Sequence, residues 1–292
     1  MTQGEHSGDG VDGLAADEAV EAEAPATYKA WGSHARVAGG LLGVMAAESR
    51  LGTGRPGLAA GERPESVGLI DVAQAFVSLQ GQGTPLDVAT ELRHLDSPAW
   101  LLAVAVVRPL SEDVSRDALR LAHAAGVPGH ALPHCLAYVR LAAELLGGVS
   151  DTEAIEEVTG QRARSRLVSA LTLCGDPHLD ALTTSIWALL QRGPFPDVLG
   201  ALASLAPPAI AAAAGGLLGL RDGASVVPTD WHPYLPAAGC VALAGELVRV
   251  RHGAFLRPSP RSRPFTVVPS APGRIAGATP AVGATWGWPT TG

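Results

Sequence analysis

Two histidine-containing stretches carry residue types that could perform metal or acid–base chemistry. In HALPH, His130 and His134 stand four residues apart, a spacing that places two imidazoles on one face of a helix, as a zinc site needs. Pro133 lies between them and no third ligand is near, so we interpret this stretch as a helix start. In GDPH, Asp176 and His178 could join a Ser–His–Asp relay, but the chain contains no G-x-S-x-G elbow. We therefore expect Asp176 and His178 to be loop residues.

Other residue patterns exclude several classes of protein. The chain contains neither a P-loop nor a G-x-G-x-x-G segment that follows a strand. Cys135, Cys174 and Cys240 lie far apart and form no C-x-x-C pair, which predicts buried structural cysteines in a reducing compartment rather than a zinc site or a disulfide framework. There is no secretory signal at the N-terminus and no apolar stretch long enough to span a bilayer. We therefore expect a cytoplasmic protein without a membrane partner.

The elements that must position these residues are helices. Apolar residues recur at three- and four-residue spacing in the segments 37–49, 67–80, 115–126, 134–148, 180–193 and 237–253. Polar starts precede two further segments at Ser111 and Asp151, and glycines typical of helix ends stand at 126, 147, 193 and 253. Clear strand alternation is missing. The sequence predicts an all-α fold, with a single compact domain of roughly ten or more helices over residues 28–253.

The two ends of the chain differ from this domain in composition. Residues 1–27 contain seven acidic and no basic residues, which equals the whole net charge of −7. Residues 254–292 contain four arginines, no acidic residue and many prolines. Both compositions predict disorder, and Trp286 and Trp288 could dock the second tail on a protein partner. The acidic head and the lack of a basic patch argue against nucleic acid as a partner.

Six segments, in chain order, resemble motifs of the ADP-ribosylglycohydrolase family, which includes the dinitrogenase-reductase-activating glycohydrolases. GGLLGVMAAES (39–49) resembles the family's G-x-L-L-G-x-x-x-G-D-A, and GLIDVAQAFVSL (68–79) stands where the family has T-D-D-T-Q-M-A-L. The others are SPAWLLAVAVVRPL (97–110), AYVRLAAELLGG (137–148), TSIWALLQRGPFPDVLGALASL (184–205) and AAAAGGLLGLRDGASVVPTDW (211–231). Their order and spacing imply an ADP-ribosylglycohydrolase-like helical domain.

The resemblance also implies that the family's metal ligands are missing from this chain. In the family, the acids of T-D-D-T and G-D-T-D-T hold two magnesium ions, which orient a water against the glycosidic carbon. These acids fall on Leu69 and Ile70, and on Ala206 and Pro208 with Pro207 between them. The N-G of a third motif falls on Ser97 and Pro98, and its arginine falls on Leu102. Because apolar side chains cannot replace a cation's oxygen ligands, we expect no magnesium and no other cofactor.

Two acids remain near the matched positions. Glu48 matches the aspartate of G-D-A, and Asp71 matches the second threonine of T-D-D-T. One hypothesis makes them a relic pair that still holds one ion or a ribose hydroxyl. The alternative, which we favour, pairs Glu48 with Arg50 and points Asp71 at solvent near the start of its helix.

The sequence therefore favours a pseudoenzyme that acts as a binding, regulatory or assembly module. It would hold a nucleotide-like ligand in the remnant cleft or present its tails to a protein partner. The alternative is an active hydrolase that removes ADP-ribose from a modified substrate with the displaced acids Glu48 and Asp71. A third hypothesis is a structural protein whose tails mediate self-association. A cavity at which two carboxylates converge would favour the hydrolase.

Overall fold

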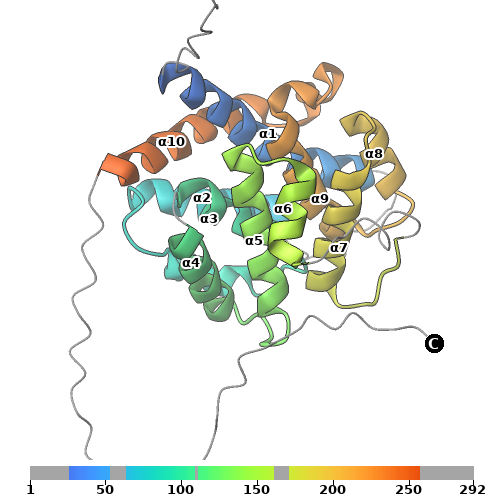
Figure 1. The fold of residues 1–292 in the computed structure, drawn as a ribbon, viewed down its shortest axis with the longest axis horizontal. Helices are drawn as coiled ribbons and strands as arrows, with labels where there is room; N and C mark the ends of the chain where they lie inside the picture. Colours follow the sequence, from blue (N-terminus) through green and yellow to red (C-terminus); the bar gives the residue numbers. More distant parts are fainter. Residues whose placement is uncertain (1–25, 53–63, 109–110, 161–170, 257–292) are drawn as a thin grey trace, which may run out of the picture.

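The computed structural model describes residues 26–52, 64–108, 111–160 and 171–256 (Figure 1). Within these ranges it contains helices and no strand, which confirms the predicted all-α fold. The α-helices are α1 (Ala26–Gly52), α2 (Glu65–Ser78), α3 (Leu102–Val107), α4 (Ser111–Ala124), α5 (Leu132–Gly147), α6 (Asp151–Thr159), α7 (Pro177–Leu190), α8 (Phe195–Leu202), α9 (Pro208–Asp222) and α10 (Ala237–Leu256). Short 3₁₀ helices include η1 (Leu86–Leu92), η2 (Pro98–Leu101), η4 (Ala224–Val226) and η5 (Thr229–Tyr234).

The ordered helices reach slightly beyond the domain expected over residues 28–253. Helix α1 begins at Ala26, and α10 ends at Leu256. The rest of the acidic head and of the Pro/Arg-rich tail, with Trp286 and Trp288, lies outside the described residues. None of the described helices is both long and apolar enough to cross a membrane.

The glycines expected at helix ends behave differently from one another. Gly126 has a φ of 80°, the left-handed conformation that ends many helices, as predicted. After α5 this role falls to Gly148, with a φ of 87°, rather than to Gly147. The predictions for Gly193 and Gly253 were wrong. Helix α7 ends through an extended residue at 191, which needs no left-handed glycine, and α10 continues through 253.

The centre of the fold is a close antiparallel pair formed by α1 and α9. A Cβ added to Gly43 would overlap the carbonyl of Gly215, and one added to Gly219 would overlap the carbonyl of Gly39. Every residue of α9 from 210 to 220 is buried. The small residues of this helix therefore let two backbones approach closely. Pro207 caps the helix and Pro208 is its first residue, where proline is tolerated.

The neighbours of α9 run parallel to it and antiparallel to α1. At one end, the Arg221 guanidinium of α9 donates to the carbonyl of Leu189 in α7. The Arg36 guanidinium of α1 donates to the carbonyl of Leu145 in α5, and the Tyr138 hydroxyl of α5 donates to the carbonyl of Ala213 in α9. The amino-terminal ends of α5, α7 and α9 and the carboxyl-terminal end of α1 therefore point to one end of the bundle.

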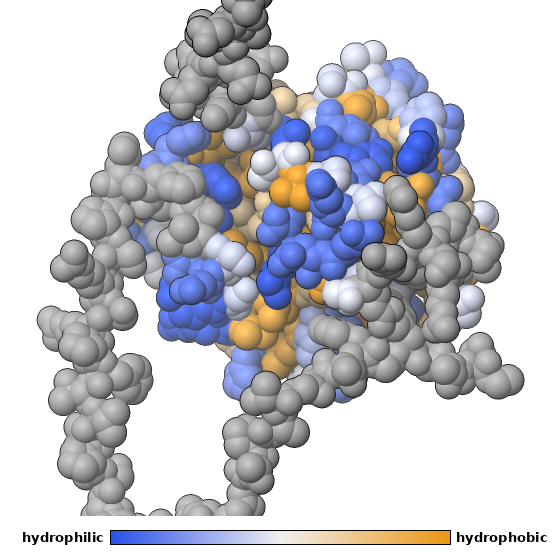
Figure 2. All heavy atoms as spheres, in the orientation of Figure 1, coloured by the Kyte–Doolittle hydropathy of each residue, from blue (hydrophilic) through white to orange (hydrophobic). Residues whose placement is uncertain are grey.

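The exposed large apolar side chains come from separate elements: Val67, Leu79, Leu86, Leu119, Leu205 and Val241. Figure 2 shows apolar areas divided by hydrophilic side chains on the face seen in Figure 1. Scattered exposed apolar residues of this kind are ordinary on protein surfaces.

Candidate functional site

The end of the bundle where helices begin holds two carboxyl groups on adjacent helices. The Glu48 carboxylate, near the end of α1, accepts a hydrogen bond from the Ser66 backbone N–H at 3.2 Å to each oxygen. Ser66 is the second residue of α2, whose first N–H groups have no partner within the helix. Burial raises the pKa of Glu48, and the hydrogen bonds from Ser66 oppose this rise. Glu48 therefore ties the end of α1 to the start of α2.

Glu65, the first residue of α2, is the second carboxyl group and is more deeply buried. Its side chain is 2% exposed, and its Oε1 accepts a hydrogen bond from the Ser97 backbone N–H at 2.8 Å. Its Oε2 is buried without a hydrogen-bond partner. Burial, and to a smaller extent the nearby Glu48 charge, raises the pKa of Glu65 to about 8, against the hydrogen bond from Ser97. At pH 7 the Glu65 carboxyl is therefore mostly protonated.

The matched positions of the two metal-binding motifs carry apolar side chains. Leu69 is fully buried and Ile70 packs against the core, four and five residues after Glu65 in α2. Ala206 and Pro208 are partly buried at the start of α9. All four contribute apolar surface. The acid at the start of α2 was missed in the sequence, although its place directly after Pro64 is where helices favour an acid.

Asp71 does not share the environment of Glu48. Glu48 contacts Ser66, and Asp71 stands five residues later in α2, which is about 7 Å along a helix axis. Asp71 is partly buried, in the second turn rather than the first. The expected alternative partner of Glu48, Arg50, has no described side chain. The structure places Glu48 against the first turn of α2, where its charge acts on Glu65.

The two histidine-containing stretches meet in space. Asp176 is the N-cap of α7, where its Oδ1 accepts hydrogen bonds from the N–H groups of His178 and Leu179 at 3.0 and 3.2 Å. The prediction of a loop residue was wrong for His178, which lies inside α7, whereas Asp176 lies just outside the helix as its cap. The Nε2 atom of His130 lies 3.6 Å from Oδ2 of Asp176. His134 lies in the first turn of α5, which confirms the helix start predicted for HALPH.

We call His130, His134, His178, Asp176 and Asp96 the histidine cluster. His178 is 7% exposed, and its Nε2 is buried without a hydrogen-bond partner. Burial lowers the pKa of both His134 and His178, while Asp176 opposes the shift at each and Asp96 opposes it at His178. Among the described residues, no group of three or more His, Cys, Asp or Glu side chains is arranged to hold a metal ion.

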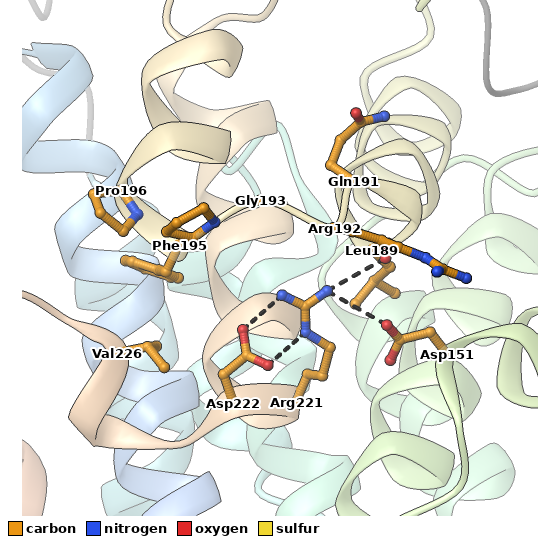
Figure 3. Close-up of a pocket in the computed structure, with 11 residues that line it drawn as sticks. Asp151, Leu189, Gln191, Arg192, Gly193, Phe195, Pro196, Arg221, Asp222 and Val226 are labelled. Carbon is orange, nitrogen blue, oxygen red and sulfur yellow. Dashed lines mark hydrogen bonds and ion pairs between the residues drawn. The ribbon is translucent and has the colours of Figure 1, made fainter.

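A pocket of about 510 Å³ opens at the opposite end, where α7 and α9 finish (Figure 3). Arg221 lies in it and donates from Nε and Nη2 to Asp222, both at 2.6 Å. Its Nη1 lies 3.4 Å from Asp151 and 3.3 Å from the Leu189 carbonyl. The volume suits a small ligand, but the charges of Asp151, Asp222, Arg221 and Arg192 balance. The pocket contains none of the matched positions.

Comparison with models of known protein families and with curated proteins finds no match for this chain. Two groups of residues at the amino-terminal ends of the helices are therefore the candidates for a function. One is the Glu48–Glu65 pair, and the other is the histidine cluster. Asp96 and Ser97 connect them, because Asp96 acts on His178 and the Ser97 N–H binds Glu65.

Proposed function

We propose that this chain is a catalytically silent domain of ADP-ribosylglycohydrolase-like architecture that acts in the cytoplasm as a binding or regulatory module. The observation that carries the proposal is that the two carboxyl groups at the site bind backbone N–H groups. Glu48 and Glu65 each accept a backbone N–H from a neighbouring segment, Ser66 and Ser97 respectively. A carboxyl group engaged in this way fastens helices together.

The protonation of Glu65 supports the same conclusion. Mg²⁺ is bound by ionised carboxylates and water in octahedral geometry. Burial keeps the pKa of Glu65 at about 8, so ionising it for a cation would cost free energy at neutral pH. Leu69, Ile70, Ala206 and Pro208 add no oxygen ligand. The free cysteines, two of them buried, fit a reducing compartment.

The proposed ligand is nucleotide-like. Helices α2, α5, α7 and α9 begin at the same end as the two carboxyl groups, and helix amino termini favour phosphate groups. A protein partner on the tails is the other proposed contact, and it would involve residues outside the described ranges.

An active hydrolase is the second candidate function, and one observation favours it. The charge of Glu48 acts on Glu65, and Glu65 has the raised pKa that a general acid needs. In this candidate function Glu65 would donate a proton to the leaving group and Glu48 would act as the ionised partner. Asp71, the acid considered from the sequence, would have no role in the chemistry.

Calorimetry and an activity assay separate the two functions. The full chain is titrated with ADP-ribose, in MgCl₂ and separately in EDTA, and is incubated with a mono-ADP-ribosylated protein. We expect binding in the micromolar range that does not depend on Mg²⁺, with no release of ADP-ribose. The absence of binding in both buffers would overturn the nucleotide-like ligand.

Two variants test the role of Glu65. Glu65→Gln keeps an acceptor for the Ser97 N–H and removes the titrating group, while Glu157→Gln changes an exposed glutamate of α6. Metal-dependent release of ADP-ribose that is lost in Glu65→Gln and kept in Glu157→Gln would establish the hydrolase and overturn the proposed binding module.

A further inference from the structure

We propose that the histidine cluster is a proton-sensitive latch, which holds the amino-terminal ends of α5 and α7 together while His134 and His178 are neutral and releases them in acid. The latch is distinct from the proposed binding function. It rests on where the two stretches stand in their helices, on their burial and on the charges around them.

The position of both histidines in their helices opposes protonation. His134 is the third residue of α5, and His178 is the second residue of α7. The first turn of a helix carries unpaired N–H groups and the positive end of the helix dipole, so a cation there is unfavourable. Because the two helices begin side by side, an imidazolium on either helix faces the positive ends of both.

Burial adds to this effect at His178. The residue is 7% exposed and its Nε2 has no hydrogen-bond partner. A neutral imidazole can leave one ring nitrogen without a proton, whereas an imidazolium carries an N–H on both. Protonation would therefore bury a charged donor that lacks an acceptor, which costs free energy until the site opens to water.

The acids in the cluster offset the cost of protonating His134 and His178 only in part. Asp176 favours protonation of His134 and His178, and Asp96 favours it at His178, while His130 opposes it at both. Asp176 already caps α7 through Oδ1. Burial has the largest effect on the pKa of each of these two histidines, and it lowers that pKa.

The other titratable groups on the packed elements are committed elsewhere. The oxygens of Asp180 accept the N–H groups of Cys174 and Gly175 at 2.8 and 2.9 Å. Behind His134 on α5 stand the thiol of Cys135, which burial keeps protonated, and the hydroxyl of Tyr138, which donates to Ala213. Glu65 of α2 acts on Tyr138 rather than on the histidines.

The direction of the pH effect follows from linkage. Because the folded-state pKa values of His134 and His178 lie below 6.5, the opened state binds more protons in acid. The stabilisation is therefore present above about pH 6.5 and is lost as the pH falls through the folded-state values.

Hydrogen exchange on the full chain tests the latch. We expect protection of the first turns of α5 and α7 to fall between pH 7.5 and 5, after correction for intrinsic rates, because acid favours the opened state. The last turns of the same helices should keep their protection. Equal protection of the first turns at both pH values would overturn the proposal.

Two variants and one titration complete the test. His178→Gln should reduce the pH response, whereas His123→Gln, which changes an exposed histidine at the end of α4, should leave it as in the wild type. A full response in His178→Gln would refute the role of His178. Should that variant fail to fold, NMR titration of the wild type decides: midpoints below 6.5 for His134 and His178 support the latch, and midpoints at or above 6.5 refute it.

Discussion

Replacing Glu65 with glutamine should make the protein more stable at neutral pH, and the structure indicates by how much. Glu65 is 2% exposed, and burial raises its pKa from 4.5 to about 8. A group whose pKa is raised on folding stabilises the folded state fully below its unfolded pKa, and this contribution is lost as the pH rises through the folded value. For Glu65 the loss therefore runs from about pH 4.5 to pH 8.

The magnitude follows from the size of the shift. One pKa unit corresponds to about 1.4 kcal/mol. As the pH rises from 5 to 7.5, the buried Glu65 carboxyl therefore lowers the free energy of unfolding of the wild type by about 3 kcal/mol, and a neutral side chain would cause no such loss. Glutamine is close in shape and keeps the acceptor for the Ser97 N–H. The free energy of unfolding of Glu65→Gln should thus rise by about 3 kcal/mol relative to that of wild type over this range.

Urea denaturation at several pH values between 5 and 8.5 measures this difference. The histidine cluster contributes equally to both proteins, so its pH dependence cancels when the two curves are subtracted. Glu157→Gln, an exposed control, should run parallel to wild type. If the Glu65→Gln curve also runs parallel to wild type, within about 0.5 kcal/mol, then Glu65 is ionised at little cost and the reasoning is wrong.

Two further substitutions test the packing that positions the site. Gly215→Ala should lower the free energy of unfolding in urea by about 2 kcal/mol or more, because its Cβ would overlap the Gly43 carbonyl. Gly200→Ala, in an open position of α8, should be neutral or slightly stabilising. Equal effects of the two substitutions would contradict the close approach of α1 and α9. Tyr138→Phe should lower stability by about 1–2 kcal/mol, because the buried hydroxyl donates to Ala213 at 3.0 Å; an unchanged denaturation midpoint would show that this bond contributes nothing.

The features that the sequence determines by itself are local ones. The starts of α4, α5, α6 and α9 were predictable, because a polar cap or a proline acts on the backbone within a few residues. The small residues before Leu217 predicted a close helix contact, since only glycine and alanine let backbones approach. The sequence likewise shows directly that Leu69 and Pro208 are apolar. The resemblance to ADP-ribosylglycohydrolases stays a prediction.

The features that only the tertiary structure decided depend on residues far apart in the chain. Glu65 has an acid's ordinary pKa until α1, Ser97 and the core remove it from water. His130 and His134 come within reach of Asp176 and His178 only because α5 and α7 run parallel. Periodicity and caps act along one helix, but desolvation and charge act between helices, and their strength depends on distances that folding alone sets. The carboxyl pair and the histidine cluster therefore exist only in the folded chain.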